Sequence, residues 1–341
     1  MASPVEVAAM RRAIDLARTP GVPLGPNPRV GCVLLDGDSG VVAEGFHRGA
    51  GHRHAEVDTL LAAGELAAGT TAVVTLEPCN HTGRTGPCTA ALRDAGVVRV
   101  VYAAPDSSPM ARGGAERLRH AGIDVEGDVL ADEARAINPE WTFAVEHSRP
   151  FVTWKFAATL DGRSAAVDGT SRWITSAEAR ADVHRLRAEC DSILVGIGTV
   201  LADDPQLTVR DDRGTPLERR LQPLRAVLGL RQIPAGAAVI DDAADTVHLV
   251  TRDPHEALAA LFSRGRHRTW LEGGPTVAAA FMREGLVDRV VAYIAPSLLG
   301  AGPAAISDLG ITTVSDAVAL EISDVTAVGP DVRITARPGK E

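Results

Sequence analysis

The sequence predicts an α/β protein with two domains, and three observations lead to this prediction. The chain has 341 residues, about twice the length of a typical domain. It is 45% hydrophobic and 23% charged, which is enough apolar material for two cores. Strand-like and helix-like segments alternate, which in the first half implies a mostly parallel sheet covered on both faces. We place the domains at residues 1–146 and 150–341, because the stretch between them is polar and ends in Pro150.

The segments of the first half follow from local signals. Ser3-Pro4 with Glu6 predicts the start of an amphipathic helix. Two apolar runs, 30–35 and 41–43, flank a Gly/Asp/Ser turn and predict a hairpin. A helix that follows His54 is expected to end at Gly64. The next segments are expected to be a strand over 70–78, a helix over 87–96 with Pro87 in its first turn, and a strand over 97–106.

The second half continues the alternation. A buried strand at 151–159 leads to a turn, and the next helix is expected to begin at Thr175 or Ser176. Two strand-glycine-helix units cover 192–210 and 269–285, and an apolar strand begins at 289.

The glycine junctions of these two units, 196–199 and 272–276, could hold phosphate on backbone amides at a helix N-terminus. Either junction is weak evidence by itself, and tight packing of the turn is the favoured explanation. The first is not a dinucleotide fingerprint, because Leu201 occupies the position of the third glycine. A Rossmann fold is therefore disfavoured.

Charge and cysteine content narrow the class of function. A net charge of −9 disfavours nucleic acid as a partner, since that binding depends on Lys and Arg. A small phosphorylated metabolite remains compatible with it. The four cysteines do not resemble an extracellular disulfide framework, and we expect Cys32 and Cys190 to be buried thiols. No secretory signal or apolar membrane span is apparent, so we expect a cytoplasmic enzyme with no membrane partner.

His54, Cys79 and Cys88 form the cluster that suits a soft metal. One imidazole and two thiolates favour Zn²⁺, and three protein ligands leave the fourth tetrahedral position for water, as in catalytic zinc sites. Glu56 follows two residues after His54 and is the expected proton carrier. H-x-E followed by P-C and a second cysteine is the signature of zinc nucleobase deaminases, although the usual spacing of two residues between the cysteines is wider here.

Three other interpretations compete with this one. His54 could be a surface histidine, and the cysteines ordinary buried thiols. A structural zinc scaffold would normally supply four ligands and would leave Glu56 without a role. A zinc deaminase of a nucleoside or nucleic-acid base with an accessory binding domain would share the motif, but for a nucleic acid it would need a basic, aromatic groove that this acidic chain does not suggest.

Both halves together resemble the bifunctional deaminase and reductase family of riboflavin biosynthesis. The wide cysteine spacing is typical of that family, whereas Gly86 stands where the family usually has proline. The motifs that carry the resemblance are PNPRVG (26–31), HAE (54–56), EPCNHTGRTGPC (77–88), TLDGR (159–163), SRWIT (171–175), VLADDPQLT (200–208) and EGGPT (272–276).

The resemblance implies a cytidine-deaminase-like first domain. That domain would use Zn²⁺ to deaminate 2,5-diamino-6-(5-phosphoribosylamino)pyrimidin-4-one, with Glu56 as the catalytic residue. Arg84 would be the partner of the substrate phosphate. The residues expected to bind the deaminase substrate are Asn27, His47, Asn80, Arg84 and Thr85. For His47, the alternative is a structural histidine.

The resemblance also implies a dihydrofolate-reductase-like second domain that uses NADPH to reduce the ribosyl group to a ribityl group, and a homo-oligomer. The alternative for Arg187 is a solvated helix arginine, and for Arg210 a loop charge. The residues expected to bind the cofactor are Ala157, Trp173, Thr199, Asp203, Gly274, Pro275, Thr276, Val277, Ala278, Ala279 and Ala280. Those expected to bind the reductase substrate are Ser171, Arg187, Leu207, Arg210 and Glu272.

Overall fold

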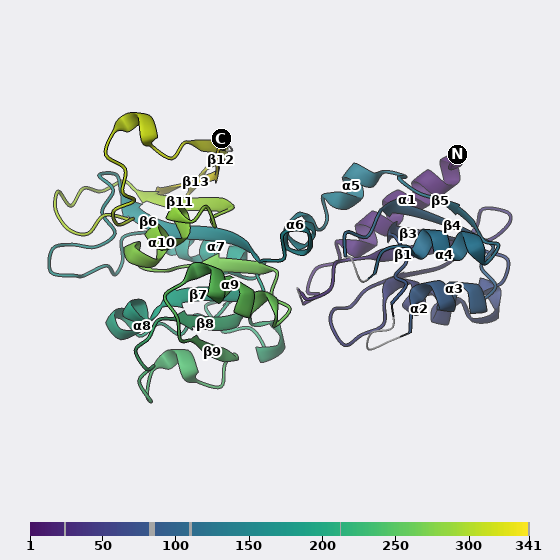
Figure 1. Cartoon of the computed structure of the whole chain (residues 1–341), viewed down its shortest axis with the longest axis horizontal. Coiled ribbons are helices and arrows are strands. Elements are labelled where there is room, and N and C mark those ends of the chain that lie inside the picture. The colour runs from purple at the N-terminus through teal and green to yellow at the C-terminus, as the bar shows by residue number, and fades with distance from the viewer. Residues whose placement is uncertain (24, 82–85, 109–110, 212, 340–341) are drawn as a thin grey trace. The chain divides into compact units, whose positions relative to one another are not determined.

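The computed structural model describes residues 1–23, 25–81, 86–108, 111–211 and 213–339 (Figure 1). It divides into two compact units, Met1–His147 and Ser148–Glu341. No helix within the described ranges is long and apolar enough to cross a membrane.

The first unit contains a sheet whose strands run in the order β2-β1-β3-β4-β5. Its strands, as far as the residues are described, are β1 (Gly31–Leu35), β2 (Val41–Phe46), β3 (Thr71–Leu76), β4 (Arg99–Ala104) and β5 (Asp124–Glu126). Its helices are α1 (Pro4–Ala17), α2 (Ala55–Ala63), α3 (Cys88–Asp94), α4 (Gly114–His120), α5 (Ala131–Arg135) and α6 (Pro139–His147), and a 3₁₀ turn, η1, covers Gly64–Ala67.

Local chemistry explains the ends of several of these elements. Ser3 and Glu6 form a reciprocal capping box at the start of α1, as the sequence predicts. The predicted hairpin is β1 paired antiparallel with β2. Gly64 ends α2 with a positive φ of 57°, which glycine adopts without strain. Pro87 lies just before α3 rather than inside its first turn, so Cys88 is the first helical residue.

The expectation of a mostly parallel sheet is wrong for the first unit, because β1 runs antiparallel to both of its neighbours. The tight turn fixes the direction of β1 against β2, and β1 then lies between β2 and β3. Beyond β3 the sheet is parallel, through β4 to β5. The carboxyl ends of β3 and β4 therefore lie at the same edge, and the segments that follow both strands meet there.

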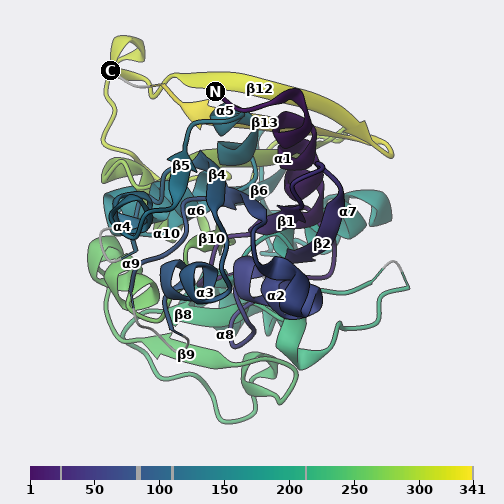
Figure 2. The same cartoon turned by 90° about the vertical axis from the view of Figure 1, so that its right-hand side faces the viewer.

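Helices cover both faces of this sheet, as expected. Alternate residues of β1 face opposite sides. Cys32 and Leu34 pack in one cluster with Leu60 of α2 and Leu92 of α3, while Val33 packs in another with residues of α1. Figure 2 shows α2 and α3 beside one another over the sheet. The N-terminal ends of these two helices carry His54 and Cys88.

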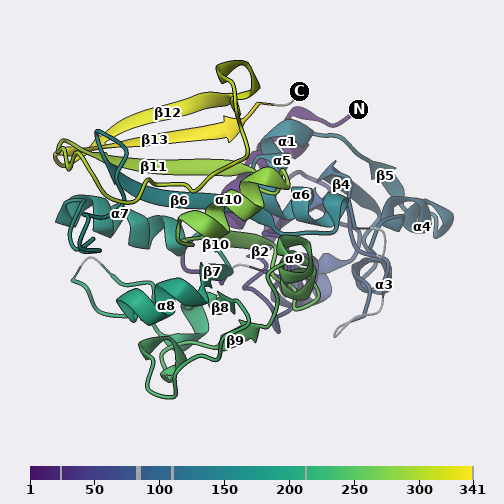
Figure 3. The ribbon, with the colours of Figure 1, turned by 60° about the vertical axis from the view of Figure 1, so that its left-hand side comes forward.

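The second unit contains a larger sheet, with the strand order β12-β13-β11-β6-β10-β7-β8-β9 (Figure 3). Its strands, within the described residues, are β6 (Phe151–Thr159), β7 (Ser192–Gly196), β8 (Leu224–Leu228), β9 (Thr246–Leu249), β10 (Arg268–Leu271), β11 (Arg289–Ala295), β12 (Leu320–Val328) and β13 (Asp331–Pro338). Its helices are α7 (Ala177–Arg187), α8 (Ile197–Asp203), α9 (Pro254–Phe262) and α10 (Pro275–Arg283), with 3₁₀ turns η2 (Arg219–Leu221), η3 (Ala238–Ile240) and η4 (Val314–Asp316).

The strands from β11 to β9 are all parallel, and β12 and β13 add an antiparallel hairpin at one edge. Ser176 caps α7, which selects one of the two predicted starts of that helix. β8, β9, α9 and the final hairpin were not predicted from the sequence. In β12 the apolar side chains of Ile322 and Val325 are 62% and 60% exposed, and the pairing register shifts between Ile322 and Asp324.

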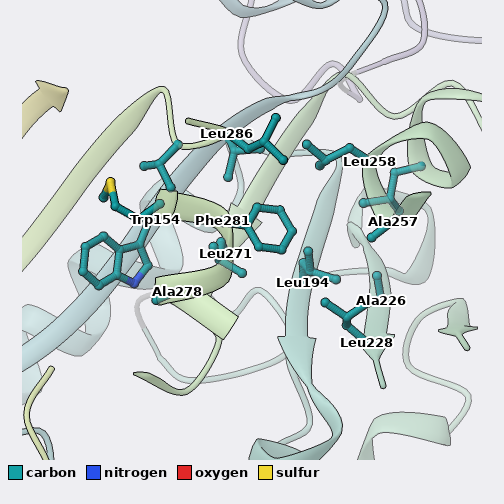
Figure 4. Packing of buried hydrophobic residues seen from close by; sticks show 14 of the residues in the cluster. Trp154, Leu194, Ala226, Leu228, Ala257, Leu258, Leu271, Ala278, Phe281 and Leu286 are labelled. Carbon is teal, nitrogen blue, oxygen red and sulfur yellow. The ribbon is translucent and has the colours of Figure 1, made fainter. Parts of the chain in front are cut away.

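Two hydrophobic clusters lie on opposite faces of the second sheet. Leu194 and Leu271 pack on one face against Leu258 of α9 and Phe281 of α10 (Figure 4). The other cluster contains Ile193, together with residues of α7 and α8. β7 and β11 are mostly apolar, as expected for parallel strands buried on both faces, and the sequence marks them clearly. Arg225 in β8 and His248 in β9 interrupt this pattern, and these two strands were not predicted.

Candidate active sites

The predicted metal ligands come from three separate elements of the first unit. His54 is the residue before α2 and makes no capping hydrogen bond with its side chain, so its imidazole is free for another partner. Cys79 follows β3, and Cys88 begins α3. The backbone N–H of Cys88 donates to Sγ of Cys79 at 3.4 Å, which joins the two segments.

The structure brings these three side chains together. Nδ1 of His54 lies 3.2 Å from Sγ of Cys88 and 3.5 Å from Sγ of Cys79, and all three ligand atoms lie within 4.8 Å of one another. A tetrahedral zinc ion about 2.3 Å from sulfur and about 2.0 Å from nitrogen would separate such ligand atoms by roughly 3.5 Å. The donor set and its spacing therefore fit zinc.

Electrostatics at the cluster favour a thiolate. The Cys88 thiol lowers the pKa of Cys79 to about 4 by donating to it, and His54 adds to this effect against the opposing effect of burial. The pKa of Cys88 is raised because that thiol keeps the proton it shares with Cys79 and is buried. The hydrogen bond to Cys79 raises the pKa of His54. Removing the shared proton would leave two thiolates and an imidazole for a metal ion.

Glu56 lies in the first turn of α2 and is buried beside the cluster. Burial, together with the negative charge of Cys79, raises its pKa to about 7. A carboxyl group that titrates near neutral pH can both accept and release a proton, as a proton carrier must.

Asn27 and His47 lie at the same site, as predicted for substrate contacts. Nδ2 of Asn27 is 3.0 Å from Nε2 of His47, whose Nδ1 is 2.8 Å from the carbonyl oxygen of Arg53. The carbonyl requires Nδ1 to carry the proton, so Nε2 accepts from Asn27. The rings of His47 and His54 meet edge to face with centroids 5.5 Å apart. Burial lowers the pKa of His47, which keeps this imidazole neutral.

The segment after Cys79 is placed only in part. Asn80 is exposed, and its Oδ1 accepts from Oγ1 of Thr89 at 3.2 Å. Arg84 and Thr85, both predicted to contact the substrate, lie outside the described residues.

Two buried carboxylates that the sequence analysis missed support this edge of the sheet. Glu77 accepts from the backbone N–H of Ala115 at 2.9 Å and of Asp106 at 3.3 Å. Asp106 accepts from the N–H of Ser108, and burial raises its pKa to about 6. A signal was present, because Glu77 lies one residue after β3 and Asp106 two residues after the neighbouring strand β4.

In the second unit, loops that follow neighbouring parallel strands also meet at one edge. A Cβ added at Gly196 or Gly273 would lie 2.7 or 2.8 Å from side-chain atoms of Val277, so only glycine allows these two junctions to pack on α10. A Cβ at Gly274 would lie 3.6 Å from Oγ1 of Thr199. The two predicted phosphate-binding junctions are therefore neighbours in space.

The other predicted cofactor contacts lie on several elements. Ala157 is on β6 and is partly buried. Trp173 is 69% exposed, and the guanidinium of Arg180 lies 4.2 Å from its ring centroid. The side chain of Arg172 donates to the backbone carbonyl of Asp203, which joins the Ser171–Trp173 segment to the end of α8.

The predicted cofactor contacts around the start of α10 differ in their exposure. Gly274 precedes the helix and has no side-chain cap, Pro275 is at its start, Thr276 is exposed, and Ala280 is partly buried. The side chains of Ala278 and Ala279 are buried in the core, so they cannot make cofactor contacts themselves.

The predicted substrate arginines of the reductase unit have protein partners. Arg187 forms an ion pair with Glu272, and its Nη1 donates to the carbonyl of Thr208 at 3.1 Å. Arg210 donates to the side chain of Gln206 and to the carbonyl of Gly214. Burial and the charges of Arg187 and Arg210 lower the pKa of His184 to about 4, which places this imidazole near both guanidinium groups.

Leu207 and Lys155 qualify the prediction for this site. The side chain of Leu207 is buried in the core, so a substrate contact would have to come from its backbone. Lys155 lies on β6 and interacts electrostatically with Glu272 and Arg187. It was not among the residues predicted from the sequence. Burial lowers its pKa, against the opposing charge of Glu272. A single lysine within the apolar strand FVTWKFAAT was the available signal.

Two family models match the chain. The model described as the cytidine and deoxycytidylate deaminase zinc-binding region covers residues 5–104, and the RibD C-terminal domain covers residues 150–334. The riboflavin biosynthesis protein RibD of Mycobacterium tuberculosis H37Rv is 48% identical over 312 residues, which cover 91% of each chain. The chain belongs to the RibD family. It is an enzyme of riboflavin biosynthesis with a deaminase unit and a reductase unit.

Other RibD proteins match over nearly the whole length. The Escherichia coli K12 protein is 38% identical, with 95% of this chain and 96% of that protein covered. A solved structure of Acinetobacter baumannii RibD has a TM-score of 0.89 at 35% identity and covers 98% of this chain and 99% of its own. The solved diaminohydroxyphosphoribosylaminopyrimidine deaminase/5-amino-6-(5-phosphoribosylamino)uracil reductase of Thermotoga maritima has a TM-score of 0.82 at 31% identity, with 98% and 99% covered.

Proposed function

We propose that the deaminase unit hydrolyses 2,5-diamino-6-(5-phosphoribosylamino)pyrimidin-4-one, and that the reductase unit then reduces the ribosyl group of the product with NADPH. The observation that carries this proposal is the convergence of His54, Cys79 and Cys88 beside buried Glu56. The related Thermotoga maritima protein is named for the same pair of activities.

The deaminase residues have separate roles in the proposal. His54, Cys79 and Cys88 hold zinc, which when bound supplies a nucleophile from water at neutral pH. Glu56, buried beside these ligands with its pKa raised to about 7, would carry a proton from the attacking water to the departing amino nitrogen. Asn27 and His47 orient the pyrimidine ring, with His47 held in one tautomer by the carbonyl of Arg53. Asn80, Arg84 and Thr85 meet the ribosyl phosphate.

The reductase unit acts mainly by placement. NADPH would supply the hydride, which adds to the sugar carbon next to the amine after the ribose ring has opened to the imine. The ring oxygen leaves that carbon and becomes a hydroxyl group of the ribityl chain. Ala157 offers a small side chain against which a flat ring can lie, and Trp173 offers an exposed face. Thr199, Asp203 and the first turn of α10 contact the cofactor, with the helix N-terminus facing its phosphates. Ser171, Arg187, Leu207, Arg210 and Glu272 form the substrate side of the site, and Glu272 binds the polar sugar or base.

A nucleic-acid base deaminase is the weaker candidate. The chain carries a net charge of −9, and aromatic residues make up 4% of it. A nucleic-acid groove needs positive charge and stacking side chains. We therefore propose that the substrate is a small phosphorylated pyrimidine. We also propose that the enzyme works in the cytoplasm as a homo-oligomer.

The direct test is to incubate the purified full-length protein with the diaminopyrimidine ribosyl phosphate, with and without NADPH. Without NADPH, we expect release of ammonia and accumulation of the deaminated ribosyl compound. With NADPH, we expect the ribityl compound and oxidation of one NADPH per product. If no ammonia is released by the zinc-loaded protein, the deaminase assignment is wrong.

A further inference from the structure

We propose that Arg231 binds the 2′-phosphate of NADPH and thereby makes the reductase unit prefer NADPH to NADH. This inference rests on the proposed NADPH-dependent reductase and adds the residue that distinguishes the two dinucleotides. They differ by one phosphate on the adenosine ribose, so a cationic group at that position would favour NADPH.

The topology defines where the two ends of the cofactor can lie. β6, β10, β7 and β8 are neighbours in that order and run parallel, so their carboxyl ends lie at one edge of the sheet. Ligands of open α/β sheets bind outside the carboxyl ends of the strands. The three spacings from β6 to β8 span roughly 14 Å, at about 4.8 Å for each pair.

The loops after β10, β7 and β8 form a continuous row along this edge. Gly274, after β10, approaches Thr199, as its Cβ position 3.6 Å from Oγ1 shows. Gly229, after β8, has a φ of 142° and approaches Ile197 so closely that a Cβ there would lie 2.4 Å from the side chain. With the nicotinamide near Ala157 and the pyrophosphate at Gly274, the adenosine end extends toward β7 and β8.

Arg231 stands at the β8 end of this row. Its Nη2 lies 3.9 Å from the position of a Cβ on Gly198, so the guanidinium lies over the first glycine junction. Arg231 is exposed, and its side chain forms no hydrogen bond or ion pair with any residue that the structure describes. Leu230 beside it is 53% exposed, which provides an apolar surface next to the cation, as an adenosine group needs.

Three other arginines of this unit are already committed to protein partners. Arg187 is paired with Glu272, Arg210 with Gln206, and buried Arg225 with Asp241. A guanidinium presents several donors in a fixed fork that matches phosphate, and an exposed arginine gives these donors up to a ligand at little cost. Arg231 is thus a free phosphate partner at the place where the topology puts the adenosine ribose.

The test measures nucleotide binding by the zinc-loaded full-length protein, using titration calorimetry with NADP⁺, NAD⁺, 2′,5′-ADP and 5′-AMP. We expect Arg231→Ala to weaken NADP⁺ and 2′,5′-ADP binding tenfold or more, and NAD⁺ and 5′-AMP binding less than twofold. Arg231→Lys should restore part of the difference. Arg252→Ala is the matched control, because Arg252 is also exposed and follows the next strand, β9; its affinities should stay within twofold of wild type.

The outcomes separate this inference from the proposed function. If the wild-type protein prefers NADP⁺ and Arg231→Ala keeps that preference, the inference is wrong while the reductase stands. Equal binding of NADP⁺ and NAD⁺ by the wild type would also overturn it. If the wild type binds neither nucleotide and makes no ribityl product with either reduced form, the proposed reductase function itself fails.

Discussion

Arg187 and Glu272 form a two-pronged ion pair in the reductase unit. Nε donates to Oε1 at 2.6 Å and Nη2 to Oε2 at 2.5 Å, and each side chain is 13% exposed. The end of α7 is thereby joined to the residue that follows β10. Arg187 is not a solvated helix arginine, and a substrate phosphate would have to share it with Glu272.

We therefore expect Arg187→Ala and Arg210→Ala to differ in their effect on stability. Arg187→Ala removes the ion-pair partner of a largely buried carboxylate, which keeps only the hydrogen bond from Nε1 of Trp270 and the charge of Lys155. It should lower the free energy of unfolding by about 3 kcal/mol. Arg210→Ala loses only hydrogen bonds to neutral groups and should cost about 1 kcal/mol. Urea unfolding of the full-length protein measures both. A smaller loss for Arg187→Ala than for Arg210→Ala would contradict this account of the pair.

The same two variants test the substrate assignment. If both arginines contribute to phosphate binding, each substitution should raise the reductase KM tenfold or more. Zinc content and deamination should be unchanged, because the zinc ligands and Glu56 belong to the other unit. Loss of deamination with normal reduction would show that our assignment of the two arginines to the reductase site is wrong.

Glu272 should also make the reductase unit sensitive to acid. Burial opposes its ionisation, but the charge and hydrogen bonds of Arg187 outweigh burial and lower the pKa from 4.5 to about 2. Because the folded-state pKa is the lower one, this stabilisation is present above pH 4.5 and is lost as the pH falls toward 2. Between pH 7 and pH 3 the loss should be on the order of 2 kcal/mol. Unfolding of Glu272→Gln should depend less on pH by that amount; an identical pH dependence would refute the prediction.

Glu56→Gln should separate metal binding from proton transfer. The amide keeps the size of the side chain but cannot carry a proton, so we expect deamination to fall by about 10²- to 10⁴-fold. Zinc content, measured by atomic absorption, should remain that of the wild type. Reduction of the already deaminated substrate serves as the internal control. Near-normal deamination by this variant would show that another group carries the proton.

Removal of the metal should affect only one of the two activities. We expect one zinc per chain, and dialysis against a strong chelator should abolish deamination while reduction persists. Alkylation followed by mass spectrometry should then modify Cys79, which is 7% exposed, faster than in the zinc-loaded protein. Cys32 is fully buried in β1 and should react slowly in both states. Equal labelling of Cys79 with and without zinc would argue against its role as a ligand.

Gly114 offers a structural test of the same centre. A Cβ at Gly114 would lie 1.8 Å from the carbonyl oxygen of Pro78, the residue before Cys79. Gly114→Ala must therefore displace the segment that carries a metal ligand, and we expect about 1–3 kcal/mol of destabilisation together with reduced zinc occupancy. Gly37→Ala is the control, because a Cβ there meets no atom within 4 Å. Full zinc occupancy in Gly114→Ala would show that Pro78 can move without disturbing Cys79.

Local features were predictable from the sequence, and long-range ones were not. Ser3 and Ser176 cap their helices through contacts three residues away, so the residue order alone reveals them. The motif spacing likewise indicated which residues meet at the metal cluster. The pairing of Arg187 with Glu272 depends on the order of strands in a sheet, which spacing along the chain does not encode. The antiparallel placement of β1 beside β3 was missed for the same reason.

The final hairpin was missed for a different reason. A strand is recognised by apolar residues on alternate positions, because one face is buried. β12 buries neither face, and its register shift interrupts the alternation at Ile322. Lys155 was overlooked because it stands alone in an apolar strand, where its charged partners come from distant segments.

The position of β6 inside its sheet has a consequence for synthesis of the chain. This strand pairs with β10 and β11, which follow on the order of a hundred residues later, so at roughly 5–20 residues per second its partners emerge many seconds after it does. Until then the apolar segment Phe151–Thr159 has unpaired edges on the ribosome. The first unit has no such delay at β1, because β2 follows it directly in a hairpin. Nascent-chain aggregation should therefore begin in the reductase unit, and chaperone demand should be greatest after β6 has emerged and before β11 has been made.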